Sequence, residues 1–125
     1  MSEIEILTQF KKNLIQFLDE LIAQFPEEGD LVIARIFLND QIPIADVMNT
    51  FIRKLLPLES QVAERNENFF LENNLLFDTI DKNKVNHFKR MWRSDRLDRD
   101  DRDIIWKWYD SFIFLAKKYQ SVKKN

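Results

Sequence analysis

Residues 2–25 read SEIEILTQFKKNLIQFLDELIAQF, and apolar side chains recur in them at every third or fourth position. This spacing places the apolar residues on one face of an α-helix and the polar residues on the other. Ser2 followed three residues later by Glu5 is typical of a capping box at a helix start, and Pro26 is expected to end the helix. The predicted apolar stripe consists of Leu7, Phe10, Leu14, Phe17, Leu21 and Phe25.

The other end of the chain predicts a second long helix. It opens with Asp98, Asp100, Asp101 and Asp103 and closes with Lys117 and Lys118, which is the charge order that a helix dipole favours. Residues 120–125 are expected to form a frayed basic tail. The stripe expected to be buried consists of Ile105, Trp108, Phe112, Leu115 and Tyr119.

Shorter helices are predicted between these two. Residues 31–38 are apolar nearly all round, which indicates a helix buried at the centre of the fold, although a short strand starting at Leu31 fits the same pattern. Pro43 suits the first position of the next helix, and Pro57 is expected to open a short new helix. Residues 66–80 favour short helical turns, after which a basic helix follows.

Composition sets the fold class. One glycine and three prolines in 125 residues leave little material for tight β-turns, whereas 45% hydrophobic residues are ample for a core. We therefore predict an all-α fold, a compact bundle of five to six amphipathic helices with long first and last helices, forming a single domain over residues 1–119. The acidic start, the lack of a membrane-length apolar run and the absence of cysteine predict a cytoplasmic protein.

The residue types that catalysis needs are scarce. The chain has one histidine, His87, no cysteine and no glycine-rich phosphate loop, so neither a nucleophile–base pair nor a two-histidine metal site can be assembled. Five aspartates in residues 95–103 lack the glycine and the bidentate glutamate of a calcium loop, and the arginines between them suit an ion-paired helix start. We predict a non-enzymatic protein without catalytic residues, metal, cofactor or small-molecule substrate.

Aromatic residues concentrate in Trp106-Lys107-Trp108-Tyr109, and on a helix these rings cannot all face one core. Because Trp and Tyr are frequent anchors at protein interfaces, the predicted protein-binding patch consists of Trp106, Tyr109 and Ile113. Through it the chain would bind another protein, or itself as a homo-oligomer. The alternative is that these residues pack on the long first helix or cover a dimer seam.

The distribution of charge offers a second hypothesis. Residues 1–62 hold 5 basic and 10 acidic side chains, a net charge of −5, whereas residues 63–125 hold 14 and 11, a net charge of +3. The basic residues of the 82–96 segment lie beside Trp92, and such residues make phosphate contacts while an aromatic ring stacks on a base. The alternative function is therefore a nucleic-acid-binding accessory protein that uses Lys82, Lys89, Arg90 and Arg93.

Three segments carry a resemblance to a known group of proteins. They run from FPEE to QIP (residues 25–43), from FFLENN to WRS (69–94) and from IWKWY to KY (105–119). Together they resemble short helical proteins encoded by large nucleocytoplasmic DNA viruses of amoebae and algae. The resemblance implies a virus-encoded protein in the host cytoplasm, in the viral factory or in the virion, and it transfers no functional residue. A helical regulator of host cell death that holds an amphipathic helix in a groove is a third hypothesis.

Overall fold

The computed structural model describes residues 2–67, 90 and 97–123, and these residues form helices and connecting turns without any β-strand. The all-α prediction is confirmed. Four of the helices in this part of the chain have eleven residues or more, which is fewer than the five to six amphipathic helices predicted. The elements are α1 (Glu3–Gln24), α2 (Gly29–Asp40), α3 (Ile44–Lys54), the 3-10 helix η1 (Leu56–Leu58), α4 (Glu59–Ala63) and α7 (Arg99–Lys123).

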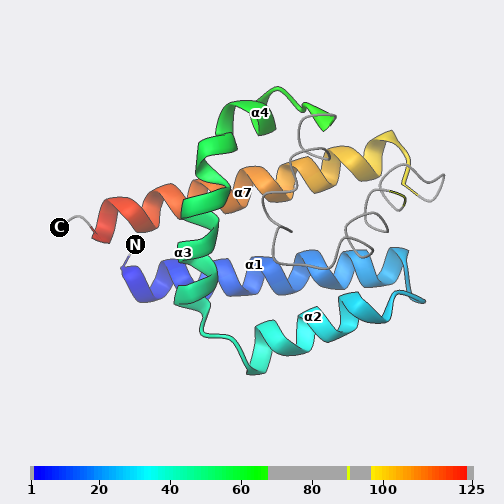
Figure 1. Cartoon of the computed structure of the whole chain (residues 1–125), viewed down its shortest axis with the longest axis horizontal. Coiled ribbons are helices and arrows are strands. Elements are labelled where there is room, and N and C mark those ends of the chain that lie inside the picture. Colours follow the sequence, from blue (N-terminus) through cyan, green and yellow to red (C-terminus); the bar gives the residue numbers. More distant parts are fainter. Residues whose placement is uncertain (1, 68–89, 91–96, 124–125) are drawn as a thin grey trace.

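Helices α1 and α7 lie side by side and antiparallel, so the two ends of the chain meet at the same end of the molecule (Figure 1). The predicted capping box is confirmed, because the backbone N–H of Glu5 donates to Ser2 Oγ at 3.1 Å. Helix α7 extends to Lys123, so residues 120–123, predicted to be a frayed tail, are helical.

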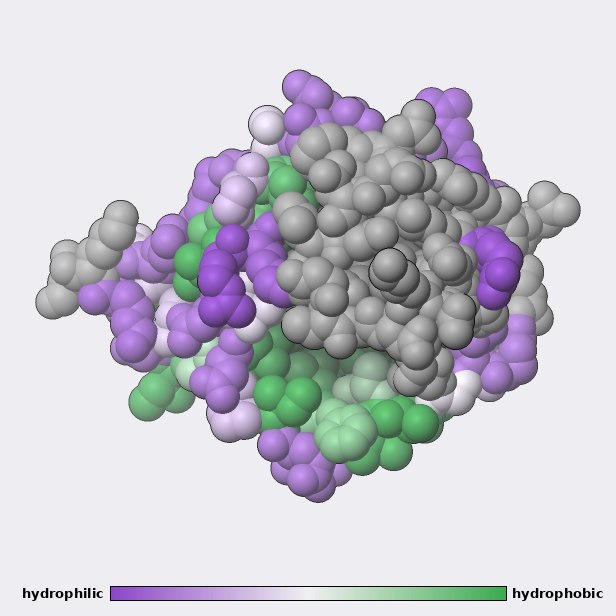
Figure 2. Space-filling model, in the orientation of Figure 1, coloured by the Kyte–Doolittle hydropathy of each residue, from purple (hydrophilic) through white to green (hydrophobic). Residues whose placement is uncertain are grey.

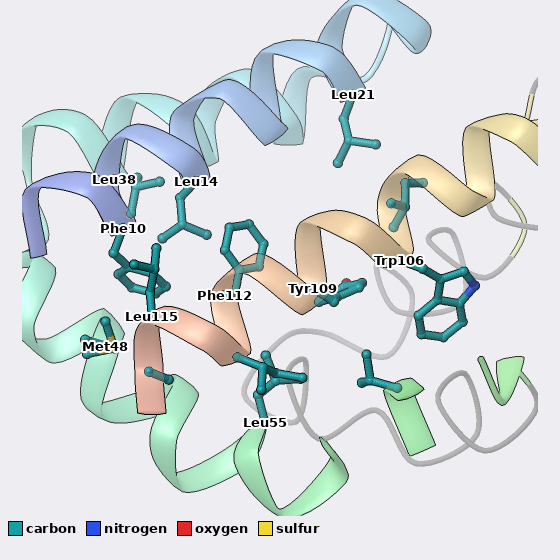
Figure 3. Packing of buried hydrophobic residues seen from close by; sticks show 14 of the residues in the cluster. Phe10, Leu14, Leu21, Leu38, Met48, Leu55, Trp106, Tyr109, Phe112 and Leu115 are labelled. Carbon is teal, nitrogen blue, oxygen red and sulfur yellow. The ribbon is translucent and has the colours of Figure 1, made fainter. Parts of the chain in front are cut away.

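Helix α3 crosses both long helices and closes the core over them (Figure 1). Phe10 of α1, Phe51 of α3 and Phe112 of α7 meet there edge to face, with ring centroids 5.1 to 6.0 Å apart. Figure 3 shows Phe10, Leu14 and Phe112 pointing toward one another from α1 and α7. Edge-to-face ring pairs add to the free energy gained from burial, so this cluster fixes how the three helices cross.

The chain after α3 behaves as its prolines predict. Pro57 lies within η1, and α4 follows directly, which confirms the expected short helix after this proline. Pro43 is the N-cap of α3 and not its first helical residue. Helix α4 ends after five residues because the chain turns at Arg65, whose φ is 55°.

Polar contacts join the start of α1 to the end of α7. The hydroxyl of Tyr119 donates to Glu3 Oε1 at 3.3 Å, and Lys123 Nζ lies 3.5 Å from the same oxygen. The negative charge of Glu3 raises the pKa of Lys123. These contacts hold the antiparallel pair in register at the end where the chain begins and finishes.

Candidate protein-interaction surface

Helix α2 lies along the outer side of α1, at the edge of the molecule (Figure 1). Within the described part of the chain, its only extensive contact is with α1. The prediction that residues 31–38 are buried at the centre is therefore wrong. The central position is taken by α7, whose eight buried residues include four aromatic ones, Trp106, Tyr109, Phe112 and Tyr119. In α2, by contrast, Leu38 is buried while four other large apolar residues are exposed.

One side of α2 is fastened to α1. Leu38 is buried and Leu31 packs against the core. Arg35 Nε donates to Asp19 Oδ1 of α1 at 2.5 Å, and Lys11 Nζ of α1 donates to the backbone carbonyl of Asn39 at 2.9 Å. These contacts fix the rotation of α2 about its own axis and so decide which of its side chains face outward.

The outward side of α2 is apolar. Val32, Ile33, Ile36 and Phe37 are 38%, 51%, 50% and 49% exposed, and we call these four residues the α2 outer face. Their spacing of one, three and four residues places them on the same side of a helix. Figure 2 shows hydrophobic side chains gathered along the lower edge of the molecule, where Figure 1 draws α2.

A carboxylate ends this apolar strip. Asp40 follows Ile36 by four residues and Phe37 by three, so it lies on the same side of α2, and it is exposed. The side-chain amide of Asn39 donates to Asp40 Oδ1 at 2.9 Å. Among the described residues no salt bridge joins Asp40 to a lysine or an arginine. The α2 outer face is thus an apolar surface with an acidic group at its C-terminal end.

Such a surface has the features of a binding site. A helix that is apolar all round normally has partners on opposite sides, and α2 has a described partner on one side only. Exposed apolar patches rimmed by polar groups mark interaction sites in proteins. The pattern in residues 31–38 was visible in the sequence, but the sequence did not reveal that this helix lies at the edge of the bundle.

The predicted patch on α7 lies in a different environment. Trp106, Tyr109 and Ile113 have exposures of 3%, 4% and 7%, so the prediction that they form an exposed patch is corrected: they belong to the core. The reason is that α7 is covered on several sides, by α1, α3 and α4. The guanidinium of Arg65, which follows α4, lies 5.7 Å from the centre of the Trp106 ring.

One aromatic ring of this cluster does reach the surface. Trp108 is partly buried, and its indole N–H donates to Glu20 Oε2 of α1 at 2.6 Å. Its ring packs between Phe17 and Phe112, with centroids 6.1 and 6.2 Å away. Trp108 therefore ties α1 to α7 by both apolar and polar contacts.

Most of the predicted nucleic-acid-binding residues lie outside the described residues, namely Lys82, Lys89 and Arg93, and His87 lies there too. Arg90 is described as an exposed helical residue.

In residues 2–67, 90 and 97–123, no group of three or more His, Cys, Asp or Glu side chains is arranged to hold a metal ion. Asp98 and Asp101 of the acidic segment cap α7: the Asp101 N–H donates to Asp98 Oδ1 at 2.8 Å, and the Asp98 N–H donates to Asp101 Oδ2 at 3.2 Å.

A groove runs between α1 and α7 and has a volume of about 250 Å³. Its apolar lining includes Leu21 and Ile105, and its two acidic side chains are already engaged within the fold. Glu20 accepts the Trp108 hydrogen bond, and Asp101 caps α7. The acidic groups of this groove therefore already have partners within the fold, whereas Asp40 at the end of the α2 outer face has no salt bridge among the described residues.

Comparisons of the chain with protein-family models, with curated proteins and with solved structures found no match. No helix built from the described residues has the length and apolar character needed to cross a membrane. The candidate surface is therefore defined by its own geometry, by the position of α2 and by the exposure of its apolar side chains.

Proposed function

We propose that this protein is a non-enzymatic helical interaction or adaptor module that binds another protein through the α2 outer face. A single observation carries the proposal: a helix that is apolar nearly all round lies at the edge of the bundle, with Val32, Ile33, Ile36 and Phe37 exposed. The proposal keeps the function class expected from the sequence and moves its site from α7 to α2.

The size of this surface limits what it can bind alone. Full burial of a large apolar side chain contributes about 1.5–3 kcal/mol, so four half-exposed ones contribute roughly 3–5 kcal/mol. A twelve-residue helix is about 18 Å long, whereas a stable interface buries about 800 Å² on each partner. The α2 outer face would thus be the central contact of an interface that also includes neighbouring residues.

Origin and location are part of the same proposal. The resemblance to short helical proteins of large DNA viruses suggests a virus-encoded adaptor that acts in the host cytoplasm. The nucleic-acid hypothesis stays a prediction for residues 82–96, of which the structure describes Arg90.

The proposal is tested by affinity purification from cells that naturally contain the protein, with and without nuclease. The test variant, I36Q/F37Q, removes apolar surface from α2 while glutamine keeps a high helix propensity. The matched control, I104Q/F114Q, removes the same residue types from α7, where Ile104 and Phe114 are 46% and 57% exposed. We expect the wild type and the control to capture partner proteins even after nuclease treatment, and we expect the test variant not to capture them.

Equal capture by all three proteins would exclude the α2 outer face as the binding site. Capture that disappears after nuclease treatment would instead favour the nucleic-acid alternative. The variants also need circular dichroism spectra and melting temperatures close to those of the wild type, so that a loss of binding reports on the surface and not on the fold.

A further inference from the structure

We infer that the partner of the α2 outer face is an amphipathic α-helix that places a lysine or arginine against Asp40. This inference rests on the proposed function and specifies the chemistry of its partner. It is carried by the arrangement of side chains on α2 and by the charge at one end of that arrangement.

The exposed side of α2 has the relief of a helix-packing surface. Val32, Ile36 and Asp40 are spaced by four residues and form one ridge, and Ile33 and Phe37 form a second, parallel ridge. The groove between two such ridges receives a row of side chains from a second helix. A strand would instead need an open sheet edge, and the described residues contain no strand.

Charge then selects the kind of helix. A partner that fills the groove beside Ile36 and Phe37 also comes close to Asp40, because Asp40 continues the first ridge by one turn. An apolar or acidic residue there would leave the carboxylate desolvated or facing another negative charge. A basic residue pairs with it, and the net charge of −5 over residues 1–62 attracts a basic segment before contact.

The same charges argue against two other partners of the α2 outer face, a second copy of the chain and an anionic lipid surface. In a pair of α2 helices from two copies of the chain, each α2 outer face would bring Asp40 and no lysine or arginine, so neither copy would supply the basic group that Asp40 needs. An anionic lipid surface attracts basic segments, whereas this apolar strip ends in a carboxylate. A basic amphipathic helix satisfies both the apolar and the acidic part of the surface.

The test uses two designed 18-residue helical peptides that carry leucines in one stripe. One peptide has lysine at both ends of the stripe, and the other has glutamate at the same positions; a scrambled lysine peptide is the composition control. Binding to the full chain is measured by fluorescence anisotropy at low and high salt. We expect the lysine peptide to bind about five-fold more tightly than the glutamate peptide, and salt to reduce this difference.

Variants assign the binding to α2 and to Asp40. I36Q/F37Q is expected to weaken the binding of both peptides by about ten-fold or more, whereas I104Q/F114Q should leave the affinity for both peptides unchanged. D40K is expected to reverse the preference, so that the glutamate peptide binds more tightly. A preference that is unchanged in D40K would overturn the inference.

The remaining outcomes separate this inference from the proposed function. If both peptides bind equally and both need Ile36 and Phe37, the interaction surface stands and the basic partner is excluded. If neither peptide binds but the chain forms a dimer that I36Q/F37Q dissociates, the occupant is a second copy. Binding to anionic vesicles that I36Q/F37Q abolishes would identify a membrane instead and overturn both proposals.

Discussion

Arg65 holds the carboxylate of Asp110 with two hydrogen bonds, from Nη1 at 2.9 Å and from Nη2 at 2.6 Å. Nη1 also donates to the backbone carbonyl of Val62 at 3.0 Å, and the guanidinium lies over the ring of Trp106. The bonds to Asp110 raise the pKa of Arg65 above its ordinary value. One side chain thus joins the end of α4 to the middle of α7, beside the tryptophan that the fold buries.

The Arg65–Asp110 pair is expected to contribute modestly to stability. Its two side chains are 38% and 47% exposed, so solvent screens their attraction. A double-mutant cycle with R65A and D110A should give a coupling free energy of about 0.5–1 kcal/mol, measured by urea unfolding. The coupling should shrink in high salt; a value that salt does not change would show that packing, and not charge, joins the two residues.

The backbone of Arg65 predicts a second effect of substitution. Arg65 ends α4 in the left-handed region with φ 55°, and the N–H groups of Arg65 and Asn66 donate to the carbonyls of Val62 and Gln61, both at 3.0 Å. Both R65A and R65G lose the ion pair with Asp110. Alanine is strained at this positive φ, whereas glycine adopts it without strain. R65G should therefore be more stable than R65A by about 1 kcal/mol. Equal unfolding free energies would mean that the turn relaxes in R65A.

The start of α7 offers a test with a close control. The side chain of Asp98, which directly precedes α7, accepts a hydrogen bond from the N–H of Asp101, whereas Asp100 in the first turn of α7 makes no such cap among the described residues. D98A should lower the unfolding free energy by about 1 kcal/mol, and D100A by a few tenths at most through the helix dipole. Similar losses for the two variants would assign the effect to charge alone.

Local features of the fold were predictable because their causes lie within a few residues. The Ser2–Glu5 capping box depends on a spacing of three, and the short helix after Pro57 depends on the fixed φ of proline. The apolar stripe of α1 is likewise a local pattern, and Phe10, Leu14 and Leu21 are buried as predicted.

The candidate site was not predictable because its exposure depends on which helix takes the centre. Residues 31–38 and residues 105–119 both have apolar side chains on more than one side, and either helix fits a central position. The structure gives that position to α7, which buries Trp106 and Tyr109 and leaves Ile36 and Phe37 exposed. Periodicity identifies the faces of a helix but not the neighbours that cover them.

This exchange of roles predicts opposite effects of substitution in the two helices. W106A removes a side chain that is 3% exposed and should cost about 3–5 kcal/mol of unfolding free energy, a large part of the stability of a small domain. I36Q/F37Q should change stability by about 1 kcal/mol or less. Urea unfolding of both variants measures these changes. A small loss of unfolding free energy in W106A would indicate that Trp106 is not part of the core and would favour the original prediction that it lies in an exposed binding patch.

Tyr109 predicts how the fold responds to alkali. Its burial raises the pKa of the phenol well above the ordinary value of 10.0, because the phenolate is not solvated inside the protein. The phenol therefore ionises more readily in the unfolded chain, so the stability it contributes is complete below pH 10 and falls as the pH rises above it. Y119F leaves Tyr109 as the only tyrosine, and its phenolate absorbance can be followed together with circular dichroism.

In folded Y119F the phenolate signal should rise only as helical structure is lost, whereas in urea the same residue should ionise near its ordinary value. Tyr119 is suited to this substitution because phenylalanine keeps its buried ring and removes the hydroxyl that bonds Glu3. A phenolate signal that appears near pH 10 with the helices intact would mean that solvent reaches Tyr109, and that α7 is less completely covered than its burial indicates.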